Sequence, residues 1–461
     1  MQEPNNIDQS IFKAYDIRGI YPEQINEENS YIIARAYATY LKKNYPDTKK
    51  VVVGSDMRLS SPSIKEKVIQ ALLDSGINVD DMGFVSTPTF YFGVSYYGYD
   101  GGLQISASHN PKEWNGLKIV GRNACPISKD NGIYEIRDYA LNNQLVPLAE
   151  EKGILGDRSR VVEAEVNDQI KNTEIDNIKP LKIVIDASNA MGSPDMRALF
   201  SKLKCEVIEM NFELDGNFPA HEADPAKPEN IEALQNKVLA EKADLGIASD
   251  GDGDRYFFVD EKGALLPQPI LRGLIAQMIL KDHPHAKIGY DTKPGKISKD
   301  MIEEAGGVPL LTPVGHSLIK ALMIKEGSVF AGESSGHYYF KLEYGTFEAP
   351  IILVLQLLQL ISEQNKALSE IAAPYKKYFN VGEINIKLLN QQQGLDKLEA
   401  VKKIYSKGIQ SLSDGVSVEY PEYWFNLRLS NTEPLIRLAV EGISQEIVDQ
   451  KKVELEKIII R

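Results

Sequence analysis

The features that mark secreted and membrane-spanning proteins are missing from this sequence. Only two cysteines are present, Cys125 and Cys205, in no spacing typical of a metal site, which indicates a reducing compartment and argues against a disulfide framework. The first ten residues contain no basic stretch followed by an apolar one, so no secretory signal is expected there. The longest apolar stretch, 349–361, is too short to cross a bilayer of about 30 Å and predicts a buried helix. We therefore expect a cytoplasmic protein that does not enter a membrane.

An excess of positive charge is also missing. The formal net charge is −13, which disfavours a nucleic-acid partner. Small anionic substrates remain compatible with this charge, because exposed charges are screened beyond about 8 Å at physiological salt. A charge-assisted hydrogen bond to a phosphate contributes about 1.5–3 kcal/mol locally, so a few well-placed arginines and lysines decide anion binding.

The 461 residues are too many for one hydrophobic core, and their pattern changes along the chain. Short β-branched runs at 51–54, 183–186, 245–249 and 288–291 alternate with helix-period stretches such as 27–45 and 228–241, which predicts α/β units with mainly parallel strands. After about residue 380, apolar and polar residues alternate over four short runs and a helix follows at 444–460, which predicts an antiparallel α+β domain. We place the domains at 1–152, 153–260, 261–371 and 372–461.

A first candidate loop, Ser-Ala-Ser-His-Asn-Pro at 106–111, directly follows an apolar run. A serine on a tight turn at the end of a strand is well placed to act as an exposed nucleophile, and Asn-Pro is a turn signal. The alternative is an ordinary polar turn in which His109 bonds to the backbone.

A second loop, Asp250-Gly-Asp252-Gly-Asp254-Arg255, also closes an apolar run. Three carboxylates separated by glycines can fold around one hard cation, and Mg²⁺ prefers such oxygen ligands together with a phosphate oxygen. A calcium loop of the EF-hand type does not fit, because its sixth position must be glycine and here it is Arg255. A solvated acidic turn is the remaining alternative, and the metal site is favoured over it.

Two further loops suit hydroxyl-rich and anionic ligands. The loop Gly-Glu-Ser-Ser-Gly-His at 332–337 offers one carboxylate, hydroxyls and one imidazole, although an ordinary glycine-bounded loop explains it equally well. The loop Arg-Leu-Ser-Asn-Thr-Glu-Pro at 428–434, followed by Arg437, offers a donor fork that matches phosphate oxygens.

Together and in this order, the four loops resemble the α-D-phosphohexomutase family, in its phosphomannomutase/phosphoglucomutase branch. The resemblance also includes 12–19, 115–118, 221–230 and 315–320, so it covers essentially the whole chain. It implies four domains, three α/β and one C-terminal α+β, around a central cleft to which each domain contributes one loop.

The resemblance also implies a role for each matching position. Ser108 is the expected phosphoserine, and a phosphoserine oxygen would join Asp250, Asp252 and Asp254 around Mg²⁺. Lys118 is expected to act as general base and acid, with a lowered pKa, while Arg255 offsets phosphoryl charge and His109 or His337 shares the proton transfer. The other active-site and substrate-binding positions are Tyr15, Arg18, Lys293, His316, Glu333, Ser335, Arg428, Ser430, Asn431, Thr432 and Arg437.

The expected activity is the interconversion of hexose 1-phosphate and hexose 6-phosphate, of mannose, glucose or both, through a hexose 1,6-bisphosphate that is also the activator. The expected partners are sugar phosphates, and the protein is expected to be a monomer or homodimer. A phosphoglucosamine mutase is the alternative, because the same Ser-Ala-Ser-His wording occurs in that branch. A sugar-phosphate phosphatase is the alternative from a different reaction class.

Overall fold

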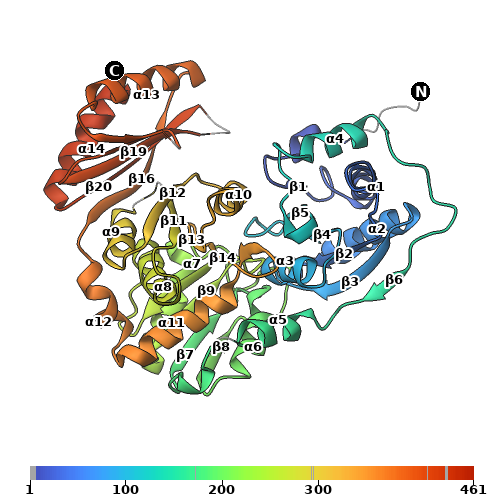
Figure 1. Cartoon of the computed structure of the whole chain (residues 1–461), viewed down its shortest axis with the longest axis horizontal. Coiled ribbons are helices and arrows are strands. Elements are labelled where there is room, and N and C mark those ends of the chain that lie inside the picture. The colour runs from blue at the N-terminus through green and yellow to red at the C-terminus, as the bar shows by residue number, and fades with distance from the viewer. Residues whose placement is uncertain are drawn as a thin grey trace. The chain divides into compact units, whose positions relative to one another are not determined.

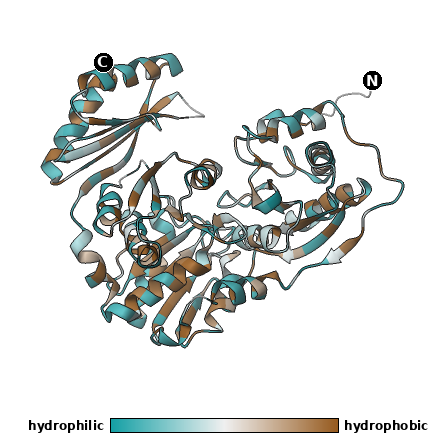
Figure 2. Ribbon diagram, viewed as in Figure 1, coloured by the Kyte–Doolittle hydropathy of each residue, from teal (hydrophilic) through white to brown (hydrophobic). Residues whose placement is uncertain are grey.

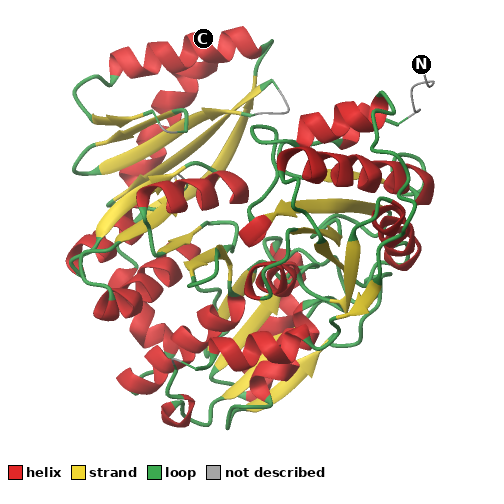
Figure 3. Cartoon of the chain, turned by 45° about the vertical axis from the view of Figure 1, so that its right-hand side comes forward, coloured by secondary structure: helices red, strands yellow, loops and turns green. Residues whose placement is uncertain are grey.

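The computed structural model describes residues 7–171, 173–291, 293, 295–412, 414–430 and 434–460. The chain folds into two compact units, and each is described here by itself. The first unit extends to Leu265 and also contains Tyr338–Leu368, whereas the second contains Leu266–His337 and the chain from Ser369 onward. Figure 1 labels the elements of both units, and Figure 3 distinguishes the strands from the helices.

The first domain contains a mixed six-stranded sheet in the order β1-β5-β4-β2-β3-β6. Its strands are β1 (Ile17–Ile20), β2 (Lys50–Ser55), β3 (Asn78–Phe84), β4 (Gly101–Ile105), β5 (Trp114–Gly121) and β6 (Leu155–Asp157). β2 pairs in parallel with β3 and β4, whereas β5 is antiparallel to both β4 and β1. The turn between the antiparallel strands β4 and β5 is the loop of the candidate nucleophile.

Helices cover both faces of this sheet. They are η1 (Gln9–Ile11), α1 (Glu27–Asn44), α2 (Ser61–Asp74), α3 (Thr87–Tyr96), η2 (Arg122–Ala124) and α4 (Ile133–Leu141). One buried cluster joins the sheet to α1, α2 and α4, and another joins it to α3. α3 begins where Ser86 accepts a hydrogen bond from the backbone N–H of Thr89, a side-chain cap that ends the preceding loop.

The second domain is built on a four-stranded sheet in the order β10-β9-β7-β8. Its elements are α5 (Val161–Gln169), η3 (Ile175–Asn177), β7 (Lys182–Asp186), α6 (Gly192–Phe200), β8 (Glu206–Met210), α7 (Pro228–Glu241), β9 (Leu245–Ser249) and β10 (Tyr256–Asp260). β7 is parallel to β8 and β9, whereas β10 turns back antiparallel to β9. The turn between β9 and β10 carries the three aspartates.

A later segment returns to complete this first unit. It comprises the antiparallel strands β14 (Tyr338–Lys341) and β15 (Thr346–Glu348), followed by α11 (Pro350–Gln364). The Tyr344 hydroxyl donates to Asp168 at 2.7 Å, and Ser362 Oγ accepts from the backbone N–H of Lys179 at 3.0 Å. α11 packs against α5 and α6. It is the buried helix predicted from the apolar stretch 349–361.

The second unit begins with parallel strands and their helices. These are α8 (Gln268–Asp282), β11 (Lys287–Asp291), α9 (Lys296–Glu304), β12 (Val308–Thr312), α10 (His316–Glu326) and β13 (Phe330–Gly332). β11 lies between β12 and β13 and is parallel to both. α8 packs against α9.

The C-terminal domain has a different topology, as expected from its alternating pattern. The chain enters it through α12 (Leu368–Ala372) and η4 (Ala373–Tyr375), and its remaining elements are β16 (Phe379–Lys387), α13 (Gln391–Ile404), β17 (Ile409–Ser411), β18 (Val416–Glu419), β19 (Tyr423–Leu429), β20 (Leu435–Gly442) and α14 (Gln445–Ile460). The sheet has the order β16-β20-β19-β18-β17 and every pair is antiparallel. Three α/β sheets and one antiparallel α+β sheet confirm the predicted fold class.

The hydropathy of the chain follows these layers. Figure 2 shows apolar and hydrophilic residues alternating around the helices, and apolar residues along many of the strands. Within the described ranges, no helix is both long enough and apolar enough to span a membrane.

Two buried carboxyls, Glu165 on α5 and Asp195 on α6, share one hydroxyl in the first unit. Thr89 Oγ1 lies 2.5 Å from Glu165 Oε2 and 3.3 Å from Asp195 Oδ1. Burial, with the neighbouring Asp195, raises the pKa of Glu165 to about 8, and burial raises the pKa of Asp195 to about 7. At neutral pH the pair therefore keeps a proton that the unfolded chain would release.

We expect Glu165→Gln to make the unfolding free energy less dependent on pH. Because the folded-state pKa values lie above the ordinary values of 4.5 and 3.8, the pair's stability is complete below about pH 4 and is lost as pH rises toward 8. The neutral amide removes one titrating group. The slope of the unfolding free energy against pH should therefore become shallower over this range, by up to about 1.4 kcal/mol per pH unit. Urea unfolding at pH 4 to 8 measures it, with Glu163→Gln on the exposed side of α5 as the control. An unchanged slope would contradict a shared proton.

Candidate active site

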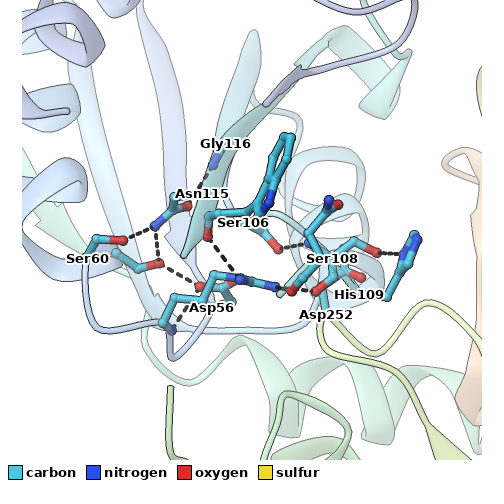
Figure 4. Close-up of polar contacts among 12 residues, drawn as sticks. Asp56, Ser60, Ser106, Ser108, His109, Asn115, Gly116 and Asp252 are labelled. Carbon is cyan, nitrogen blue, oxygen red and sulfur yellow. Dashed lines mark hydrogen bonds and ion pairs between the residues drawn. The ribbon is translucent and has the colours of Figure 1, made fainter. Parts of the chain in front are cut away.

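The turn between β4 and β5 places Ser108 at its centre. Ser108 is 2% exposed and has a φ of +52°, in the left-handed region that a serine rarely adopts. Its backbone N–H donates to Ser106 Oγ at 2.9 Å. Figure 4 shows this contact and, beside it, His109, whose Nδ1 lies 3.1 Å from Ser108 Oγ. The serine oxygen is thereby held in one orientation at the end of the strand.

The β9–β10 turn gathers the three aspartates. Asp250, Asp252 and Asp254 are all buried, and each offers a carboxylate oxygen within 4.8 Å of the others. Asp250 Oδ1 also accepts the backbone N–H groups of Asp254 and Arg255, both at 3.1 Å, which closes the turn on itself. Gly253 permits this path because its φ is +72°.

The structure brings the serine turn and the aspartate turn into direct contact within the first unit. Ser108 Oγ donates to Asp250 Oδ2 at 3.2 Å, although 142 residues separate them in sequence. A Cβ at Gly251 would lie 2.4 Å from the carbonyl oxygen of Ser108, so only glycine allows the two backbones to approach this closely. A nucleophile and a carboxylate cluster therefore form a single site.

The aspartate cluster fits a divalent cation. Three buried carboxylates this close together repel one another unless positive charge lies among them, and they are the ligands that Mg²⁺ prefers. Asp252 Oδ1 is buried without a hydrogen-bond partner among the residues that the structure describes, which leaves an oxygen for a metal ion. Among these same residues, the three aspartates are the group of His, Cys, Asp or Glu close enough to hold an ion.

A lysine from the first domain contacts the cluster. Lys118 on β5 is 4% exposed, and its Nζ lies 2.5 Å from Asp252 and 2.8 Å from Asp254. Burial lowers the pKa of Lys118, but the charges of Asp252 and Asp254 outweigh burial and raise it well above its ordinary value. The sequence led us to expect a lowered pKa, but the pKa is shifted in the opposite direction because two carboxylates contact the ammonium group directly.

Two of the remaining first-unit candidates, Arg18 and Arg255, contact the same two turns. Arg18 on β1 donates from Nη1 to Asn110 Oδ1 at 2.7 Å, so it contacts the serine turn. Arg255 Nε is 3.8 Å from Asp250 Oδ2. Tyr15 lies half-buried in the bend that precedes β1. Thr87, at the start of α3, donates to Asp252 Oδ2.

A second group of candidates lies in the second unit, on the turn after β13. Glu333 Oε2 is 3.2 Å from His337 Nδ1, and Ser335 Oγ is 2.8 Å from the same nitrogen. Glu333 Oε1 accepts the backbone N–H of Gly315, and His316 follows at the start of α10. The loop thus presents one carboxylate, one hydroxyl and one imidazole in mutual contact, a set that can donate to and accept from sugar hydroxyls.

A third group, also in the second unit, gathers the predicted phosphate-binding cations around Glu383 on β16. Glu383 lies 2.7 Å from Arg428 Nη2, 3.2 Å from Arg437 Nη1 and 3.8 Å from Lys293 Nζ. Burial raises the pKa of Glu383, but Lys293 and the two arginines lower it below its ordinary value. Ser430, two residues after Arg428 in the sequence, is buried. Its backbone N–H donates to the Leu435 carbonyl at 3.0 Å. The predicted Asn431 and Thr432 lie outside the described residues.

Three residues that the sequence analysis did not select stand out in the structure. Arg58 contacts the serine turn, Thr87 contacts the aspartate turn, and Glu383 holds the cations of the third group. The sequence does contain a signal for Arg58. Asp56 and Arg58 carry opposite charges directly after an apolar strand, a position where such a pair is expected to be buried. No comparable pattern surrounds Thr87 or Glu383, because their roles depend on distant turns.

Models of four protein domains match the chain consecutively. They are phosphoglucomutase/phosphomannomutase alpha/beta/alpha domain I at 9–145, domain II at 164–263, domain III at 270–378 and the C-terminal domain at 383–458. A phosphomannomutase of Escherichia coli K12 is 36% identical over 441 residues, covering 94% of this chain and 95% of that protein. One from Methanocaldococcus jannaschii is 34% identical and covers 98% of both.

Solved structures agree with these matches. A crystal structure of a phosphoglucomutase/phosphomannomutase family protein from Burkholderia thailandensis has a TM-score of 0.90 and 30% sequence identity, covering 98% of this chain and 97% of that one. The fold and the relatives define an intramolecular phosphotransferase of the phosphohexomutase class. The chain belongs to the phosphoglucomutase/phosphomannomutase family, which confirms the resemblance seen in its sequence.

Proposed function

We propose that this phosphohexomutase interconverts the 1- and 6-phosphates of mannose, glucose or both, through a phosphorylated Ser108. The observation that carries the proposal is the 3.2 Å contact between Ser108 Oγ and Asp250 inside a buried carboxylate cluster. Phosphoryl transfer requires mainly alignment and charge stabilisation, and this site offers both a fixed oxygen and a place for a divalent cation.

The chemistry consists of two balanced transfers. In the first, the bond between phosphorus and Ser108 Oγ breaks while a sugar hydroxyl oxygen bonds to the same phosphorus, giving a hexose 1,6-bisphosphate. The hydroxyl proton leaves to a base of the site, and Ser108 Oγ takes up a proton. In the second, Ser108 Oγ gives up its proton to a base of the site and bonds to the other phosphorus of the bisphosphate. The bond between that phosphorus and the sugar oxygen breaks, and this oxygen takes up a proton to become the free hydroxyl. The same bisphosphate would phosphorylate a resting enzyme, which makes it the activator.

The residues of the first unit would support these transfers. Asp250, Asp252 and Asp254 would hold Mg²⁺, whose charge would stabilise the phosphoryl oxygens. His109 Nδ1, at 3.1 Å, is placed to exchange a proton with Ser108 Oγ. Arg18, in contact with the serine turn, adds positive charge beside the phosphoryl group. Lys118 balances the carboxylates as an ammonium ion, and its role as general base stays a prediction.

The second unit would bind the rest of the substrate. Glu333, Ser335 and His337 would hold sugar hydroxyls, and His316 lies beside Gly315, which Glu333 contacts. Arg428, Arg437 and Lys293, together with Ser430, Asn431 and Thr432, would bind the phosphate that does not react. We also propose a cytoplasmic location, which the two free cysteines support, and a monomeric or homodimeric state.

A product assay tests the function. The purified chain, Mg²⁺ and a trace of glucose 1,6-bisphosphate are incubated in turn with the 1-phosphates of mannose, glucose and glucosamine. We expect the 6-phosphates of mannose or glucose to appear without inorganic phosphate. Preference for the amino sugar would identify the phosphoglucosamine mutase branch instead, and release of phosphate that matches substrate loss would identify a phosphatase.

We expect Arg428→Ala to raise the KM for the sugar phosphate. Loss of one charge-assisted hydrogen bond, at about 1.5–3 kcal/mol, corresponds to an increase of about 10- to 100-fold. Steady-state kinetics measures the change, and Arg197→Ala, a surface arginine paired with Glu209, is the control. If KM stayed within the range of the control, Arg428 would have no part in binding phosphate.

A further inference from the structure

Arg58 is a fully buried arginine that the proposed chemistry does not use. It lies between β2 and α2 and is 1% exposed. Charged side chains are almost never this buried unless every polar group is satisfied. Its partners therefore show what the protein uses it for.

All five N–H groups of the Arg58 guanidinium have acceptors. Nε donates to Asp56 Oδ2 at 3.1 Å, and this carboxylate balances the charge. Nη1 and Nη2 donate to four backbone carbonyls. These carbonyls belong to Ser108, Asn110, Pro111 and Trp114, at 2.7, 2.6, 2.7 and 2.9 Å respectively. One side chain thus holds the whole turn from the nucleophile to the start of β5.

The serine turn needs such support. A non-glycine residue at a φ of +52° is strained, and it keeps this conformation only where the surrounding structure holds it there. The Ser108 carbonyl that Arg58 holds is also the atom against which Gly251 of the aspartate turn packs. The position of that carbonyl therefore determines both the direction of Ser108 Oγ and its distance from the metal-binding turn.

The segment that carries Arg58 is itself fixed from two sides. Figure 4 shows Ser60 of this segment with Asn115 at the start of β5, where Asn115 Nδ2 donates to Ser60 Oγ at 2.8 Å. From the second domain, the Phe218 ring lies 5.3 Å from Arg58 Cζ. A Cβ at Gly216 would lie 2.9 Å from Arg58 Cα, so the two backbones are in close contact.

We propose that Arg58 is a positioning residue for phosphoryl transfer, which acts by holding the 108–114 backbone so that Ser108 Oγ stays beside the aspartate cluster. This inference rests on the proposed function for its kinetic consequence only. Its structural consequence, a turn whose backbone is held by one guanidinium, is measurable whatever reaction the protein catalyses.

Arg58→Lys tests the proposal. Lysine keeps the charge that balances Asp56 but offers three donors in place of a rigid fork of five, so it cannot hold four carbonyls. We expect faster amide hydrogen exchange in peptides covering 108–116, measured by mass spectrometry. We also expect kcat to fall by about 100-fold with KM within about threefold, because a displacement of about 1 Å at a reacting atom costs that much.

The control is Arg35→Lys, another buried arginine, which donates to the Val146 carbonyl. It should lose as much thermal stability as Arg58→Lys. Its kcat should stay at the wild-type value, and amide hydrogen exchange at 108–116 should stay as slow as in the wild type. Gly216→Ala is a second variant that keeps the guanidinium and presses on its backbone, so it should show the same pattern with a smaller fall in kcat.

Unchanged exchange at 108–116 in Arg58→Lys would overturn the proposal, and so would faster exchange with normal kcat. A fall in kcat that Arg35→Lys reproduces at equal stability would also overturn it. If the wild-type chain showed no mutase activity, the proposed function would fail, while the exchange measurement would still decide whether Arg58 holds the turn.

Discussion

Replacing Ser108 with alanine is expected to abolish phosphoryl exchange and to lower kcat by about four orders of magnitude or more. The change removes the oxygen that would carry the phosphoryl group, and loss of a covalent nucleophile has an effect of this size in other enzymes. The buried site is otherwise preserved, because alanine leaves the backbone contacts of the turn in place. The measurement is transfer of ³²P from labelled glucose 1,6-bisphosphate to the protein, together with steady-state turnover.

The matched control is Ser95→Ala. Ser95 is a buried serine on α3 in the same unit, and its Oγ has no hydrogen-bond partner among the described residues. This variant should incorporate label at the wild-type rate. Normal labelling of Ser108→Ala would mean that another residue carries the phosphoryl group, and the two-transfer scheme would have to be abandoned.

Asp252→Asn is expected to abolish specific Mg²⁺ binding and to lower kcat/KM by at least about 100-fold. Asp252 Oδ1 is a buried carboxylate oxygen without a hydrogen-bond partner among the described residues, and the neutral amide is a much weaker ligand for a hard cation. Stabilisation of phosphoryl charge by a metal is worth several kcal/mol, which sets the size of the loss. Calorimetric titration with Mg²⁺ and the Mg²⁺ dependence of turnover are the two measurements.

Asp176→Asn is the control for this variant, because Asp176 is 86% exposed and pairs with Lys204 on the surface. Thermal unfolding must accompany the titration, since Asp252 also contacts Thr87 and Lys118. If the variant folds and keeps the wild-type affinity for Mg²⁺, the aspartate turn is not the metal-binding site.

Much of the fold follows from local sequence patterns. β9 and α7 have the predicted bounds, and β7 and β11 each begin one residue earlier than their apolar runs. These elements are strongly periodic and end at clear turn residues, so local signals suffice. The return of Tyr338–Leu368 to the first unit was not predicted, because packing of α11 against α5 and α6 leaves no mark in the segment itself.

The candidate site was predictable where one turn holds several reactive side chains. Asp250, Asp252 and Asp254 are close in sequence and remain close in the structure, and Ser108 was selected because its turn ends a strand. The protonation of Lys118 was not predictable, because it depends on how near Asp252 and Asp254 come from another domain. The role of Arg58 was missed for a related reason. Its spacing from Asp56 indicates only a buried pair, whereas its other acceptors are backbone carbonyls some fifty residues away, which have no sequence signature.

The segment Tyr338–Leu368 has a consequence for the order in which the protein is made. The first unit lacks α11 until residue 364 has left the ribosome, and by then the whole of the chain that forms β11, β12 and β13 has already emerged. The faces of α5 and α6 that α11 covers stay bare during that interval, which is when a nascent chain is most prone to aggregation. A gene fragment that stops after Leu265 therefore lacks the helix that packs against α5 and α6.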